Sequence, residues 1–225
     1  MSAAAIRRAS TTAGIALLLL AVLGAFAYLA VVERLLVEDD AAETAANIAD
    51  SETLFRLGIA MLLVVAALDV VVAWALFVVF EPAGRGLSAL AASFRALYAG
   101  IFVVAIAELA GVLRLLPDGE EASEQVLADV LAYEDIWSAG LVFFGLHLIL
   151  LGVLVRRAAY APTILGVLLV LAGLGYAVDG FATVLFAGYD LGLATFTFVG
   201  EVVLIFWLLL RGRRLSDEAV ARREA

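Results

Sequence analysis

The sequence contains no cysteine, a single histidine and no lysine among its fourteen basic residues. Without thiols the chain cannot form disulfides, iron–sulfur clusters or thiolate zinc sites, and with only His147 it cannot form a bis-histidine haem. The net charge of −9 argues against nucleic-acid binding, which needs a basic face to neutralise phosphates. These absences exclude several redox classes, and we expect no cofactor, no metal and no nucleic-acid partner.

Charged residues are also scarce. Only 16% of the 225 residues are charged, whereas 65% are hydrophobic, and the mean hydropathy is +1.11. A soluble domain has about 25% charged residues and about half apolar ones. The composition therefore predicts an integral membrane protein, with the lipid bilayer as its first partner.

Six apolar runs are long enough to cross a membrane. A helix needs about 20 apolar residues to span roughly 30 Å of hydrocarbon, at about 1.5 Å per residue. We predict an all-α, polytopic protein with a short N-terminal segment (1–10), one transmembrane bundle (11–210) and a C-terminal tail (211–225). The predicted helices cover about 11–32, 53–80, 87–116, 136–155, 163–186 and 193–210.

Arginines and carboxylates alternate between the predicted loops. Short cytoplasmic loops are enriched in basic residues. The other loops are acidic: 34–52 holds six carboxylates and one arginine, and 117–135 holds seven carboxylates and no base. We therefore expect both termini in the cytoplasm and the protein in the cell (plasma) membrane. The arginines that set this orientation are Arg7, Arg8, Arg85, Arg156, Arg157, Arg211, Arg213 and Arg214.

The acidic segment 117–135 allows two interpretations. Its carboxylates could bind a divalent cation, but they lack the spacing of a calcium loop, so we favour a solvated acidic face. Residues 122–133 could form a short amphipathic helix on the membrane surface, with Val126, Val130 and Tyr133 on one side.

Polar residues inside the apolar helices carry a family resemblance. The segments are Thr53-Leu54-Phe55-Arg56, Leu68-Asp69-Val70, Ser93-Phe94-Arg95, Leu146-His147-Leu148, Ala177-Val178-Asp179 and Gly200-Glu201-Val202. Together they resemble domain-of-unknown-function family 4386 over about 6–212. The resemblance implies a bacterial or archaeal multi-pass membrane protein, and it assigns no catalytic residue.

A charged side chain at the bilayer centre costs at least about 2.5–3.5 kcal/mol, so such groups usually face the bundle interior and pair. Counted from the cytoplasmic helix ends, Arg95 and His147 lie roughly 12 Å deep and Asp69 and Glu201 roughly 14–17 Å deep. The candidate polar cluster is Arg56, Asp69, Arg95, His147, Asp179 and Glu201, with Tyr98, Glu108, Tyr176 and Thr197 in support.

Two readings of this cluster stay open. Arg95 can pair with Asp69 or Glu201, and Arg56 with Asp179 or Glu108, in which case the charges only fix helix packing in a structural or partner-binding protein. Alternatively, the cluster lines a pocket for a small molecule, a lipid headgroup or a proton, as in a transporter or sensor. Of these two interpretations we favour the pocket. The sequence predicts no oligomeric state.

Enzyme motifs are missing from the sequence. Ser138 lies about 13 Å along the same helix from His147, and Ser93 has no Gly-x-Ser-x-Gly context. Asp69 and Asp179 differ in depth by roughly 8 Å, too far for an aspartyl dyad. There is no Walker loop, His-Glu-x-x-His or dinucleotide fingerprint either. We expect a protein that is not an enzyme.

Glycines recur every seven residues on two predicted helices. They are Gly166, Gly173 and Gly180 on one helix, and Gly145 and Gly152 on the other. Stripes of small residues let membrane helices approach closely, so we expect these positions to be packing surfaces.

Overall fold

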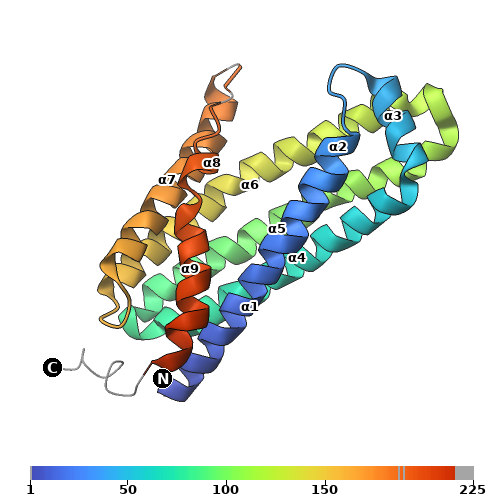
Figure 1. Cartoon of the computed structure of the whole chain (residues 1–225). Helices are drawn as coiled ribbons and strands as arrows, with labels where there is room; N and C mark the ends of the chain where they lie inside the picture. The colour runs from blue at the N-terminus through green and yellow to red at the C-terminus, as the bar shows by residue number, and fades with distance from the viewer. Residues whose placement is uncertain (1, 187, 190, 216–225) are drawn as a thin grey trace. The chain divides into compact units, whose positions relative to one another are not determined.

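The computed structural model describes residues 2–186, 188–189 and 191–215 (Figure 1). All regular structure in this part of the chain is helical, which confirms the predicted all-α class. The elements, in chain order, are α1 (Ala3–Ala27), the π-helical turn η1 (Tyr28–Val32), α2 (Glu33–Leu35), α3 (Ala41–Asp50), α4 (Glu52–Phe80), η2 (Glu81–Ala83), α5 (Arg85–Leu115), η3 (Leu116–Ala122), α6 (Ser123–Arg157), α7 (Thr163–Leu185), α8 (Ala194–Thr197), α9 (Val199–Leu210) and η4 (Gly212–Arg214).

Six helical stretches of the described residues are long and apolar enough to cross a membrane, as predicted. Large apolar side chains on them, such as Trp74, Leu171 and Phe181, are half or more exposed, which suits contact with lipid chains. The six stretches are Ala3–Leu35, Glu52–Ala83, Arg85–Gly119, Ser123–Arg157, Thr163–Leu185 and Ala194–Arg214.

The fourth stretch is much longer than predicted. It begins at Ser123 rather than at residue 136, so 122–133 is not a separate surface helix, and most of it forms the first turns of α6. No proline or glycine interrupts the chain between Ser123 and Gly140, so nothing in the sequence ends the helix there. Val126, Val130 and Tyr133 do share one face, and all three are buried.

The acidic loop 34–52 contains a helix that the sequence did not predict. The Asp40 side chain caps α3 by accepting a hydrogen bond from the Glu43 N–H at 2.9 Å. The Thr44 hydroxyl accepts from the Val37 N–H at 2.9 Å and donates to the Val37 carbonyl at 3.0 Å. These bonds attach α3 to the chain that leaves the first membrane stretch.

The chain packs as two compact units, whose boundaries fall inside long helices. Unit 1 contains Met1–Leu18, Leu68–Ala99 and Ala139–Ala225, and unit 2 contains Leu19–Ala67 and Gly100–Ser138. In unit 2 the buried core includes an aromatic group in which Trp137 lies 5.2 Å from Tyr28 and 6.2 Å from Tyr133, between ring centroids.

In unit 1 the glycine stripes bring helix backbones together. A Cβ atom at Gly173 would lie 2.5 Å from the Gly145 carbonyl oxygen, and one at Gly152 would lie 2.5 Å from that of Gly166. The backbones of α6 and α7 therefore touch at two levels, as the seven-residue repeat predicts. On the other side α7 runs beside α8 and α9 (Figure 1).

Substituting Gly173 should separate α6 from α7. In Gly173→Ala the new methyl group meets the Gly145 carbonyl and the Ile149 backbone nitrogen, neither of which can move alone. We expect a loss of about 1–3 kcal/mol in unfolding free energy, measured by unfolding of the detergent-solubilised protein. The matched control is Gly100→Ala, whose methyl group would meet nothing within 4 Å. Equal stability of the two variants would contradict close packing at Gly173.

Candidate functional site

The centre of the candidate site, within unit 1, is a buried ion pair between α4 and α5. The Nη2 atom of Arg95 donates to Asp69 Oδ1 at 2.5 Å, and both side chains are only 2% exposed. This is one of the two pairings that the depth count allowed for Arg95. A buried arginine with a direct carboxylate partner is the arrangement that apolar surroundings require.

His147 on α6 completes the contacts of the guanidinium. Its Nδ1 atom lies 2.9 Å from the Ala91 carbonyl oxygen, and its Nε2 atom lies 3.4 Å from Arg95 Nη1. A carbonyl only accepts and a guanidinium only donates, so the hydrogen must sit on Nδ1 and Nε2 must accept. The geometry therefore assigns a neutral imidazole, which adds no charge to the cluster.

Aromatic rings surround the ion pair. The Arg95 guanidinium carbon lies 5.2 Å from the centre of the Phe144 ring, within the range of a cation–π interaction. The Phe144 ring in turn lies 5.0 Å from Tyr98 and 5.1 Å from Tyr176, the latter edge to face. Phe144 lies one helical turn before His147 on α6, a spacing that places both side chains on one face of the helix.

Glu201 is the second carboxylate of the cluster, in the first turn of α9. It accepts a hydrogen bond from the Tyr176 hydroxyl on α7, and it interacts electrostatically with Arg95 and Asp69. The residue as a whole is partly exposed, but its Oε1 atom is enclosed. Among the described residues, Glu201 Oε1 and Arg95 Nε are the enclosed side-chain atoms without a hydrogen-bond partner.

Asp179 has a different role from the one predicted. Its carboxylate accepts hydrogen bonds from the backbone N–H groups of Leu193, at 2.9 Å, and Ala194, at 2.7 Å, and from the Tyr189 hydroxyl at 2.5 Å. The hydrogen bond to Asp179, followed by partial desolvation, raises the pKa of Tyr189 to about 12. The hydroxyl therefore keeps its proton at physiological pH, and Asp179 anchors the chain that enters α8.

Arg56 also differs from its predicted pairing. It forms an ion pair with Glu52, one helical turn earlier on α4, at 2.6 Å, rather than with Asp179 or Glu108. Both side chains are about half exposed, and Arg56, Glu52 and Glu108 all belong to unit 2. Thr197 donates to the Leu193 carbonyl at 3.2 Å. The structure brings together Asp69, Arg95, His147 and Glu201, with Tyr98 and Tyr176.

Six apolar, membrane-length helical stretches in the described part of the chain, with a buried ion pair between two of them, define a multi-pass membrane protein. The chain belongs to the family described as a domain of unknown function, DUF4386, which matches residues 12–212. An uncharacterised protein of Archaeoglobus fulgidus is 37% identical over 150 residues, which cover 67% of this chain and 80% of that protein. No solved structure matches the chain.

Removing one partner of the buried ion pair should be costly. In Asp69→Asn the Arg95 charge stays buried without its counter-charge, and we expect a loss of about 3–5 kcal/mol in unfolding free energy. The double variant Asp69→Asn with Arg95→Gln should lose less than the two single losses combined, because no unpaired charge remains. Equilibrium unfolding of the four proteins in detergent measures this coupling.

The exposed ion pair of Arg56 and Glu52 supplies the control for this comparison of single and double variants. Arg56→Gln removes an ion pair that is about half exposed, so we expect a loss below about 1 kcal/mol. If the Asp69 and Arg95 losses simply add, or if they are no larger than that of Arg56→Gln, the pair does not stabilise the fold.

Proposed function

We propose that this protein is a transporter or sensor of the cell membrane that binds a proton, together with a small polar molecule, beside Arg95 and Glu201. The observation that carries the proposal is the pair of enclosed polar atoms without partners. Arg95 Nε is a donor and Glu201 Oε1 is an acceptor. A molecule that offers one acceptor and one donor can satisfy both atoms, and water is the smallest such molecule.

The charge count supports proton binding at Glu201. Arg95 contributes one positive charge, the ion-paired Asp69 contributes one negative charge, and His147 is neutral by its hydrogen bonds. The cluster is therefore neutral when Glu201 carries a proton and has a charge of −1 when it does not. An uncompensated charge in apolar surroundings is expensive, which favours uptake of a proton or of a cationic group.

The competing interpretation is that all four residues only hold helices together. It accounts well for Asp69, Arg95 and His147, whose mutual contacts and the Ala91 carbonyl connect α4, α5 and α6. It accounts poorly for Glu201. A glutamine at that position would keep a hydrogen bond with Tyr176 and would remove the unbalanced charge, so a purely structural role gives no reason for a carboxylate.

Glu201→Gln separates the two interpretations. We expect the variant to stay folded but to lose a carbonyl-stretch band that a protonated carboxylic acid gives and that fades as the pH rises. The measurement is infrared difference spectroscopy of the full chain in liposomes, stepped through pH. Thermal unfolding at each pH tests the fold in parallel.

Glu108→Gln is the matched control, because Glu108 is a partly buried carboxylate on α5 outside the cluster. This variant should keep the band. If Glu201→Gln keeps the band as well, Glu201 does not bind the proton. If Glu201→Gln unfolds the protein, the carboxylate is structural.

We also propose that both termini face the cytoplasm, because arginines gather in the predicted inner loops. The absence of cysteine makes single-cysteine labelling clean. In intact cells a membrane-impermeant maleimide should label Asp39→Cys, in the acidic loop, and should label Ser2→Cys only after the membrane is permeabilised. Both native residues are exposed. The reverse labelling pattern would invert the proposed orientation.

A further inference from the structure

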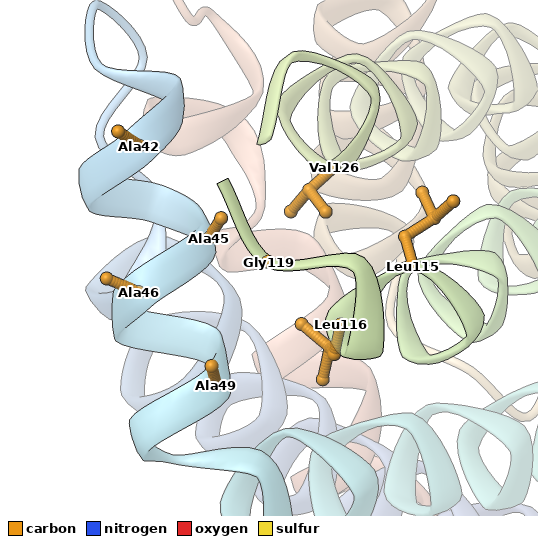
Figure 2. Close-up of a pocket in the computed structure, with 8 residues that line it drawn as sticks. All are labelled: Ala42, Ala45, Ala46, Ala49, Leu115, Leu116, Gly119 and Val126. Carbon is orange, nitrogen blue, oxygen red and sulfur yellow. The ribbon is translucent and has the colours of Figure 1, made fainter. Parts of the chain in front are cut away.

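A cavity lies in unit 2, and its lining residues are distant in the chain from Asp69, Arg95, His147 and Glu201. It has a volume of about 190 Å³. Figure 2 shows α3 on one side of it and the junction of α5, η3 and α6 on the other. Every lining side chain is apolar: Ala42, Ala45, Ala46, Ala49, Leu115, Leu116 and Val126, with Gly119 contributing backbone.

The cavity exists because one face of α3 is anchored to the protein and the opposite face carries only small side chains. One face is attached to the protein through buried Thr44, which bonds to Val37, and through buried Ile48 in the core. The other face presents alanines toward η3 (Figure 2). Alanine is too small to fill the gap, and the anchored face prevents α3 from closing it. The space is therefore part of the fold.

The segments around the cavity are acidic. Glu43 and Asp50 on α3 and Asp118 and Glu121 on η3 are exposed and follow or precede lining residues closely in the chain. Neither α3 nor η3 contains a basic residue. Arg114, at the end of α5, and Asp129 on α6 both approach Gly111, where a Cβ atom would lie 3.5 Å from Arg114 Nη2 and 3.1 Å from Asp129 Oδ2.

We propose that this cavity binds a hydrophobic cation, with an alkyl group among the alanines and an ammonium group at the acidic rim. At about 30 Å³ per water-sized group, the volume holds roughly six carbon atoms. The lining side chains are all apolar and provide no hydrogen bond, which favours an alkyl group over a polar one. The acidic rim consists of Glu43, Asp50, Asp118 and Glu121, which are exposed and lie within two residues of a lining residue in the chain. Their negative charges favour a positive head over a neutral or anionic one.

The test compares three ligands that share one six-carbon chain: hexyltrimethylammonium, 1-hexanol and hexanesulfonate. Binding to the full chain in phosphatidylcholine nanodiscs is measured by saturation-transfer NMR, with empty nanodiscs as the reference. We expect hexyltrimethylammonium to bind with a dissociation constant roughly tenfold lower than that of hexanol, and hexanesulfonate to bind more weakly than either.

Ala45→Phe should fill the cavity and weaken hexyltrimethylammonium binding by about tenfold or more. Ala49→Leu is a milder second filling, in case the first variant does not fold. Ala41→Leu is the control, because Ala41 is on α3 but does not line the cavity. Asp118→Asn should weaken the binding of hexyltrimethylammonium and leave the affinity for hexanol unchanged.

Equal affinity for hexyltrimethylammonium and hexanol would overturn the proposal and indicate an apolar occupant such as a lipid chain. Binding that survives both filling variants would also overturn it. Failure of Glu201→Gln in the infrared experiment leaves these outcomes unchanged, since Glu201 lies in unit 1 and the cavity lies in unit 2.

Discussion

The interaction on which the rest of unit 1 depends is the buried pair of Asp69 and Arg95. A guanidinium enclosed by apolar helices is stable only if a carboxylate and hydrogen-bond acceptors surround it. Asp69 supplies the carboxylate, His147 accepts a second N–H, and Phe144 places its ring face beside the charge. These residues come from α4, α5 and α6. The contacts that stabilise Arg95 therefore fix the relative position of three helix segments. They also fix the tautomer of His147.

Glu201, on α9, differs from these residues, because its side chain is hydrogen-bonded but has no counter-charge of its own. Its hydrogen bond with Tyr176 fixes one side of the carboxylate, whereas Oε1 is left without a partner. Glu201 also sits in the first turn of α9, where the helix dipole favours a negative charge by about 0.3–1 kcal/mol at exposed sites and more when buried. The dipole lowers the cost of ionisation, while apolar burial raises it. The proposed proton binding at Glu201 rests on these two opposing influences, which the ion-paired Asp69 does not share.

The membrane stretches and the depths of the central polar residues could be predicted from the sequence, because both follow from single helices. Which of Asp69 and Glu201 pairs with Arg95 could not, because that depends on how the helices pack. Composition marks the apolar runs, and a rise of about 1.5 Å per residue places Asp69, Arg95, His147 and Glu201 at similar depths. The partners of Arg56 and Asp179 were harder to predict, for two different reasons. Glu52 lies four residues before Arg56, and this spacing is a signal that could have been read. Asp179 instead accepts from Leu193 and Ala194, which come near it only because the chain reverses after α7. No periodic pattern encodes that reversal.

The reversal also places two carboxylates in the contacts between α7 and the last membrane stretch. The last membrane stretch is interrupted at Phe198, between α8 and α9, three residues before Glu201. Asp179 anchors the start of α8 to α7, and Tyr176, one turn earlier on α7, holds Glu201. Separate carboxylates therefore bind α7 to the start of α8 and to the first turn of α9. Beside Glu201 the backbones of α9 and α7 are also close, since a Cβ at Gly200 would lie 2.6 Å from the Leu168 carbonyl oxygen. Gly200 therefore sets the spacing of α7 and α9 next to Glu201, and a larger residue at this position would push the two helices apart.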